Sequence, residues 1–167
     1  MDQKKCQDGT RDWIATAVKK LELSSQVALV KPHRFQSILE RIVDQRTLLG
    51  SDAISASWWW EALREPAYCT IPTDPVRTLK SLIRANEPVW FVAEASGEKQ
   101  IGNFWLYETT IEPLCAVLAE CPHFEYYVVG KKMDWLICEN HHGVLMANGD
   151  EMATRLSEVW SPMSRGE

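Results

Sequence analysis

The sequence predicts an α+β protein in which N-terminal helices pack on an antiparallel sheet of about five strands, in the order β-β-α-β-β-β. Three observations predict this class. Apolar residues recur with a helical period through most of residues 1–86. From residue 88 they are replaced by short runs rich in β-branched and aromatic residues. Most of those runs are joined by turns that are too short for a parallel crossover, which favours an antiparallel sheet.

Residues 1–86 are expected to be mainly helical. Amphipathic stripes predict helices in three segments, and Asp74 followed by Pro75 is a typical N-cap and first residue for the third of them. A serine before the three consecutive tryptophans predicts a further short helix that ends near Pro66. The following stretch, "YCTIPTDP", contains two prolines and is expected to be a loop. The three helical segments are residues 10–23, 33–50 and 75–86.

Residues 87–167 are expected to contain the sheet. The runs at 88–95 and 103–110 predict a hairpin, the segment 110–121 a helix, and residues 150–160 a closing helix. Three further strand candidates occupy the region between these two helices. The last but one has apolar side chains on both faces, which predicts either a central strand covered on both sides or a strand whose second face meets a partner. The three candidates are residues 124–130, 134–140 and 144–149.

Length and composition are those of a single globular domain. The chain has 167 residues, of which 46% are hydrophobic and 25% charged, so it needs no metal or disulfide to fold. The first residues, "MDQKKCQDGTRDW", lack the apolar core of an export signal, and no apolar run approaches the roughly 20 residues of a membrane span. The five cysteines form no CxxC pair. We therefore expect a cytoplasmic protein with reduced thiols and no cofactor.

Charge is distributed unevenly along the chain. Residues 1–86 carry 13 lysines and arginines against 10 acidic residues, whereas residues 87–167 carry 5 against 13, which together give the net charge of −5. An acidic half repels phosphates and attracts basic surfaces. The pattern therefore argues against a nucleic-acid partner and favours a basic protein partner, although acidic residues also serve solubility alone.

The segment "ICENHHGVL" (137–145) combines a thiol, a carboxylate, an amide and two imidazoles. Asn140 at the first position of a turn and Gly143 at its left-handed position predict the loop of a hairpin, with Cys138 facing the core. A Cys/His metal site is the alternative, although its spacing departs from that of structural zinc sites. A thiol hydrolase that uses Cys138 with a nearby histidine is a further alternative. The metal alternative uses Cys121, His123, Cys138 and His141, with His142 as a further donor.

Three consecutive tryptophans, Trp58–Trp60, form the second unusual segment. On a helix they spread over some 200° at about 100° per residue, so they cannot all face one side. At least one indole is therefore expected at the surface or against another element. Tryptophan is prominent among interface hot spots, which favours a partner-binding surface. The alternative is that the indoles join the helices to the sheet.

The segment "FEYYVVGKKMDWLICENHHGVLMANG" (124–149), together with "VWFVAE", "FWLYE" and "WWWEALREP", resembles a family of small bacterial proteins of unknown function. The resemblance covers roughly residues 57–150. It implies no established activity. The size and α+β build are similar to those of immunity proteins that neutralise bacterial toxins, which is a likeness of architecture alone.

These observations predict a non-enzymatic protein-binding module, most specifically an immunity-type inhibitor that occludes a basic toxin domain. Acidic residues would attract the partner and aromatic residues would anchor it. A Cys/His metal protein or hydrolase is the second interpretation, and a scaffold or regulatory subunit the third. The residues expected to bind the partner are Glu139, His141 and His142 at the hairpin, with Trp58, Trp59 and Glu108 as secondary candidates.

Overall fold

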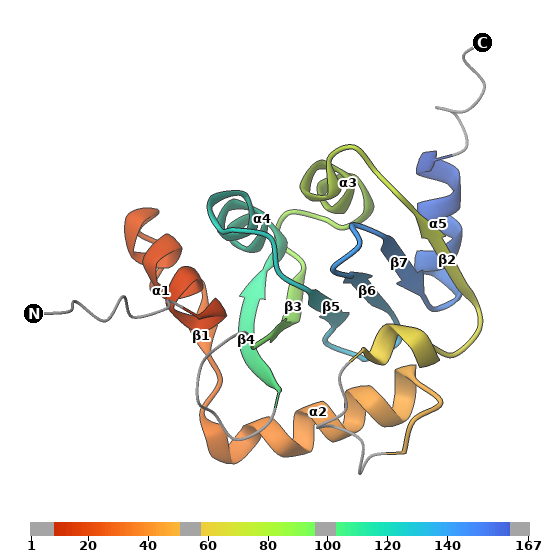
Figure 1. The fold of residues 1–167 in the computed structure, drawn as a ribbon, viewed down its shortest axis with the longest axis horizontal. Helices are drawn as coiled ribbons and strands as arrows, with labels where there is room; N and C mark the ends of the chain where they lie inside the picture. Colours follow the sequence, from red (N-terminus) through yellow and green to blue (C-terminus); the bar gives the residue numbers. More distant parts are fainter. Residues whose placement is uncertain (1–8, 51–57, 96–102, 161–167) are drawn as a thin grey trace, which may run out of the picture.

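The computed structural model describes residues 9–50, 58–95 and 103–160. In these ranges the chain forms five α-helices, a short 3-10 helix and a seven-stranded sheet (Figure 1). In chain order the elements are α1 (Thr10–Lys20), β1 (Ala28–Leu29), α2 (Pro32–Arg46), η2 (Trp59–Ala62), β2 (Ala67–Thr70), α3 (Pro75–Leu82), β3 (Pro88–Glu94), β4 (Phe104–Thr110), α4 (Ile111–Glu120), β5 (Tyr126–Gly130), β6 (Leu136–Glu139), β7 (Leu145–Asn148) and α5 (Asp150–Trp160).

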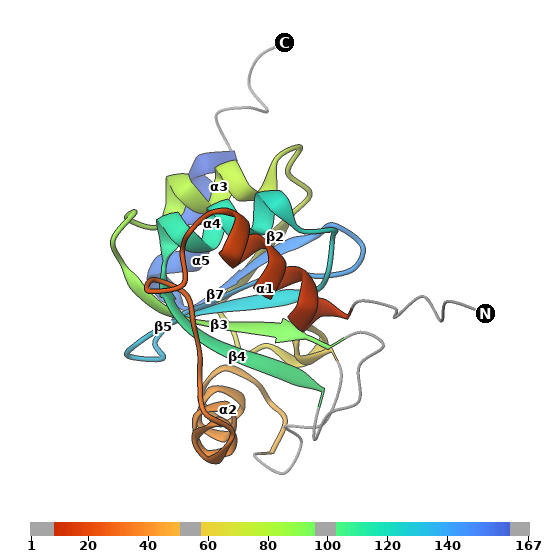
Figure 2. The same cartoon turned by 90° about the vertical axis from the view of Figure 1, so that its left-hand side faces the viewer.

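The sheet is antiparallel throughout, with the strand order β1-β4-β3-β5-β6-β7-β2. Helix α2 covers one face, and α1, α3, α4 and α5 cover the other (Figure 2). The α+β class is therefore confirmed. The expected order β-β-α-β-β-β is found from β3 to β7, with α4 in its expected place.

The sheet has two more strands than expected, and both come from the half of the chain expected to be helical. Strand β1 pairs its two residues with β4, and β2 pairs with β7, so they form the two edges of the sheet. The expectation of a loop at "YCTIPTDP" was wrong for residues 68–70, which belong to β2, whereas residues 71–74 form a loop. Pro66 and Pro72 lie just outside β2, and proline is tolerated at the ends of an edge strand, so it did not prevent pairing.

Each face of the sheet buries its own apolar layer. On the α2 face lie Trp59 of η2 and Leu136 and Cys138 of β6, all fully buried. On the opposite face lies Ile137, also fully buried, among apolar residues of the four other α-helices. The prediction that this strand is central and covered on both sides is therefore confirmed.

The helix ends follow local chemistry. The side chain of Asp74 accepts a hydrogen bond from the backbone N–H of Arg77 at 3.0 Å, as expected of an N-cap. Helix α2 ends at Arg46, before the expected Gly50, because Thr47 is extended and bridges to Leu63. Of the three tryptophans, Trp58 caps η2. The serine expected in that role, Ser57, lies outside the described residues.

Within the described ranges, no helix combines the length and the apolar character needed to cross a membrane.

Candidate functional site

The turn between β6 and β7 forms as the sequence predicts. The backbone N–H of Gly143 donates to the carbonyl of Asn140 at 3.0 Å, and Gly143 has a φ of +73°. The side-chain oxygen of Asn140 accepts from the backbone N–H groups of His142 and Val144 at 2.9 and 3.0 Å. Asparagine thus closes the turn with both backbone and side chain, which holds the two histidines in fixed positions.

Three carboxylates lie at the end of the sheet next to this turn. The register pairs Ala93 of β3 with Tyr126 of β5, and Tyr126 with Glu139 of β6. Beyond these pairs, the backbone N–H of Glu94 donates to the carbonyl of Glu125 at 3.0 Å. Because side chains alternate along strands, Glu94 and Glu125 lie on the α2 face and Glu139 lies on the other.

Glu125 is buried with a complete set of donors. Its side chain is 1% exposed. One oxygen accepts from the Tyr127 hydroxyl at 3.3 Å, and the other accepts from the backbone N–H of His141 at 3.2 Å and lies 3.1 Å from His141 Nδ1. The turn backbone, the His141 ring and the Tyr127 hydroxyl therefore surround the buried carboxylate of Glu125.

Glu139 has an equivalent arrangement on the opposite face. One carboxylate oxygen of Glu139 accepts from the Tyr126 hydroxyl at 2.6 Å, and the other lies 3.1 Å from His123 Nε2. These three residues line a cavity of about 160 Å³. Burial and the neighbouring Glu139 charge raise the pKa of Tyr126 well above its ordinary value, so the hydroxyl stays a donor. Each face of the sheet therefore carries a tyrosine–glutamate–histidine chain of contacts.

Four aromatic rings surround the turn on the α2 face. The ring centroid of His141 lies 6.0 Å from that of Trp58 and 5.9 Å from that of Trp60. His142 lies 4.0 Å from His141 and 6.3 Å from Trp60. Trp58 is 47% exposed, so one face of this cluster is open to solvent. We call the following six residues the aromatic–acid site: Trp58, Trp60, Glu94, Glu125, His141 and His142.

Glu94 is the least neutralised acid of this site. Burial first, and the charge of Glu125 second, raise the pKa of Glu94 to about 7, while His141 acts in the opposite direction. In the described part of the chain, no lysine or arginine forms an ion pair with Glu94 or Glu125. The site therefore combines an exposed indole with an acidic interior that lacks a strong cation.

Three of the expected partner-binding residues lie outside the exposed aromatic cluster. Trp59 is fully buried against Phe104 and Tyr127, so it belongs to the core. Glu139 is 6% exposed and lies on the other face of the sheet. Glu108 is exposed, but its carboxylate pairs with the Lys131 ammonium at 2.7 Å. In the β3–β4 register Glu108 lies opposite Trp90, four residues before Glu94, so Glu108 and Glu94 are separated by roughly 13 Å along the strands.

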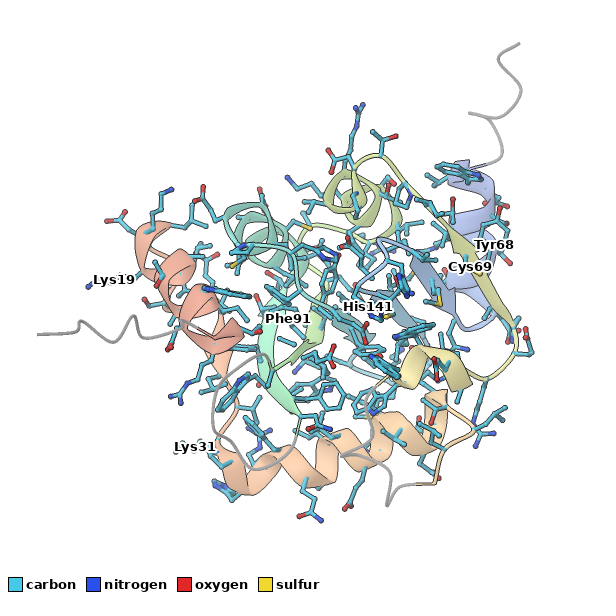
Figure 3. All side chains as sticks on the ribbon, in the orientation of Figure 1. Lys19, Lys31, Tyr68, Cys69, Phe91 and His141 are labelled. Carbon is cyan, nitrogen blue, oxygen red and sulfur yellow. The ribbon has the colours of Figure 1, made fainter. Side chains whose placement is uncertain are left out.

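His141, His142 and Trp58 remain together as expected. Figure 3 shows His141 in the middle of the molecule in that view, between α1, which carries Lys19, and the edge strand β2, which carries Tyr68 and Cys69.

The cysteines do not form the metal or hydrolase site that was considered as an alternative. Cys138 is fully buried on the α2 face, and burial raises its pKa well above the ordinary value. Burial also raises the pKa of Cys121 to about 11, so neither thiol is an activated nucleophile. Across the ranges 9–50, 58–95 and 103–160, no three histidine, cysteine or acidic side chains form a group that could hold a metal ion.

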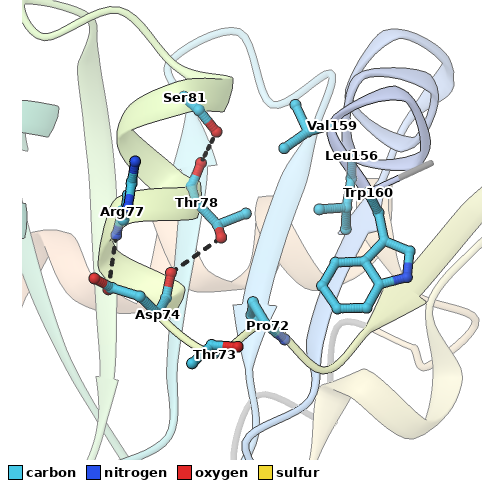
Figure 4. Close-up of a pocket in the computed structure, with 9 residues that line it drawn as sticks. All are labelled: Pro72, Thr73, Asp74, Arg77, Thr78, Ser81, Leu156, Val159 and Trp160. Carbon is cyan, nitrogen blue, oxygen red and sulfur yellow. Dashed lines mark hydrogen bonds between the residues drawn. The ribbon is translucent and has the colours of Figure 1, made fainter. Parts of the chain in front are cut away.

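A cleft with a volume of about 330 Å³ lies between α3 and α5 (Figure 4). Its apolar wall is formed by Leu156, Val159 and Trp160 of α5. The polar groups on the α3 side bond within their own helix. The hydroxyl of Thr78 donates to the carbonyl of Asp74 at 3.0 Å, and that of Ser81 to the carbonyl of Thr78 at 2.7 Å. These groups do not converge on a ligand position, so the aromatic–acid site is the stronger candidate.

The comparisons with known proteins place the chain in a family. The model of a family of unknown function, DUF6756, matches residues 7–160. The chain belongs to this family. The DUF6756 match confirms the expectation of a family of unknown function, and it is wider than the expected range 57–150 because it includes α1 and α2. Searches of curated proteins and of solved structures found no match.

Sequence analysis missed several residues of the site in this DUF6756 member. Glu94 and Glu125 were not singled out, nor was Tyr127 as the partner of Glu125 or Tyr126 as the partner of Glu139. The usable signal was their position, since each glutamate interrupts or ends an otherwise apolar strand run, "PVWFVAE" or "FEYYVV". A carboxylate in such a run is buried, and a buried carboxylate needs donors nearby.

Proposed function

We propose that the protein is a non-enzymatic, cytoplasmic binding module for another protein with a basic surface. In its most specific form it is an immunity-type inhibitor that occludes a basic toxin domain. The observation that carries the proposal is the aromatic–acid site, where the half-exposed indole of Trp58 lies beside His141, whose ring contacts the buried Glu125. In the described residues, neither Glu125 nor its neighbour Glu94 has a lysine or arginine partner. Exposed aromatics beside uncompensated acid are suited to a basic partner.

The thiol chemistry of the chain also supports binding over hydrolysis. The two cysteines nearest to the histidine–carboxylate pairs, Cys121 and Cys138, have raised pKa values because of burial, and Cys138 is inaccessible. The fixed turn that presents His141 and His142 favours a rigid contact surface, because little conformational entropy is lost when such a surface binds.

The test is partner capture followed by measured affinity. The tagged protein is used to isolate partners, with the product of the adjacent gene as the first candidate, and the dissociation constant is measured by calorimetry. Trp58→Ala is expected to weaken binding at least about tenfold, as for an interface hot spot. Leu48→Ala is the matched control, because Leu48 is 71% exposed but lies outside the site.

The proposal predicts a basic partner whose activity is blocked in the complex. Equal affinity of the Trp58→Ala and Leu48→Ala variants, or an acidic partner, would contradict it. A basic partner that stays fully active in the complex would instead support the scaffold or regulatory-subunit reading.

A further inference from the structure

We infer that the aromatic–acid site receives one arginine side chain of the protein partner, with its guanidinium against the Trp58 indole and its charge compensating Glu94 and Glu125. The inference rests on the proposed function, since it names the group that the partner inserts. Arginine fits better than lysine because its planar, weakly hydrated head stacks on aromatic rings and also hydrogen-bonds carboxylates.

The site places two acidic side chains close together. Glu94 and Glu125 are joined by a backbone hydrogen bond of 3.0 Å and face the same side of the sheet. The groups around the Glu125 carboxylate are the Tyr127 hydroxyl and the backbone N–H and ring of His141, and none of them belongs to a lysine or arginine. Burial first, and the nearby Glu125 charge second, raise the pKa of Glu94 to about 7. A bound cation offsets that charge.

Elsewhere in the chain a cation already lies between an indole and a carboxylate. Lys131 places its ammonium 3.3 Å from the centre of the Trp90 ring and 2.7 Å from the Glu108 carboxylate. Trp90 lies on β3, on the same face as Glu94 and four residues before it. There the indole, the cation and the carboxylate all come from this chain. At the aromatic–acid site the described residues supply the indole, the carboxylates and the His141 imidazole, but no lysine or arginine.

The protonation of Glu94 should change when a cation binds. Besides Glu125, His141 on the turn acts on Glu94 and lowers its pKa, whereas the Glu94 charge helps to raise the pKa of Tyr127 on β5 and of Cys138 on β6. Burial raises the pKa of both Tyr127 and Cys138, so these two stay neutral. A guanidinium therefore favours ionised Glu94, and the proton that Glu94 loses passes to solvent. Binding is expected to strengthen as pH rises through about 7.

A peptide probe tests the inference directly. Acetyl-(Gly-Arg)3-amide is titrated into the protein at pH 6 and pH 8 at constant ionic strength, and the indole N–H signals are followed by NMR. The matched control peptide carries citrulline, the neutral isostere of arginine. We expect the arginine peptide to shift the Trp58 signal and to bind about tenfold more tightly at pH 8 than at pH 6, which is the change in ionised fraction for a pKa of about 7. The citrulline peptide should not bind.

Three variants assign the effect. Glu94→Gln is expected to weaken binding and remove the pH dependence, whereas Glu108→Gln, at an acid already paired with Lys131, should leave both unchanged. His141→Gln should keep the pH dependence that comes from Glu94. Far-UV circular dichroism of each variant confirms its fold.

Several results would overturn the inference. These are no binding of the arginine peptide, equal binding of the citrulline peptide, no pH dependence, or pH dependence that survives Glu94→Gln. Equal affinity for a lysine peptide would overturn the assignment to arginine. If Trp58→Ala disrupts the partner complex while Glu94→Gln leaves it unchanged, the proposed function stands and this inference fails. If no partner binds at all, both fail.

Discussion

Glu94 keeps its proton in the folded protein at a pH at which a solvated glutamate has lost it. Its pKa is about 7 when folded, because of burial and the Glu125 charge, against an ordinary value of 4.5. Between pH 4.5 and pH 7 the folded state therefore binds more protons at this group than the unfolded state. The contribution of Glu94 to stability falls as pH rises through this window, and the loss is complete above pH 7.

Replacing Glu94 by glutamine should consequently stabilise the protein at high pH only. At pH 8 we expect Glu94→Gln to raise the free energy of unfolding by on the order of 1 kcal/mol, after allowance for solvent screening of a half-buried group. At pH 4 the two proteins should be equally stable, because both carry a neutral side chain there. Urea denaturation at the two pH values measures this. Glu108→Gln is the control, and a gain as large in that variant would contradict the assignment to Glu94.

The β6–β7 hairpin is the element whose structure was most predictable, since its information is local. The side chain of Asn140 accepts a hydrogen bond from the turn backbone, and Gly143 adopts the positive φ that the turn requires, so both residues act as expected. Strand β2 was missed because its prolines, which lie outside it, resemble those of a loop.

The pairing of Glu125 with His141 was missed for a different reason. It depends on the register between β5 and β6, which links residues 16 apart in the chain and is decided by the packing of the whole sheet. Sequence analysis could therefore place the histidines on a turn, but it could not identify the carboxylate behind them.

Gly143 tests how far the turn depends on its left-handed position. Its φ is +73°, and a methyl group at this residue would meet no atom within 4 Å, so any cost of Gly143→Ala is conformational. We expect a loss of about 1 kcal/mol in the free energy of unfolding. Gly50→Ala is a matched control, because Gly50 also has open space but no positive φ. Equal stability of the two variants, measured by thermal denaturation, would show that the turn tolerates alanine.

The two apolar layers of the molecule share one sheet, and this determines how it should unfold. Leu136 and Ile137 are consecutive residues of β6, both fully buried, but they face opposite layers. A cavity made at either residue weakens β6 itself, and β6 supports both layers through its pairing with β5 and β7. The expectation of a single domain therefore implies that damage on one face destabilises the helices on both.

Leu136→Ala and Ile137→Ala should thus behave alike despite their different neighbours. Each is expected to lower the free energy of unfolding by about 2–5 kcal/mol, the usual cost of such a cavity. Hydrogen exchange followed by mass spectrometry should show loss of protection in both α2, on the Leu136 face, and α5, on the Ile137 face, in each variant. If Leu136→Ala exposes the amides of α2 while α5 keeps its protection, the two layers unfold independently and are separate cooperative units.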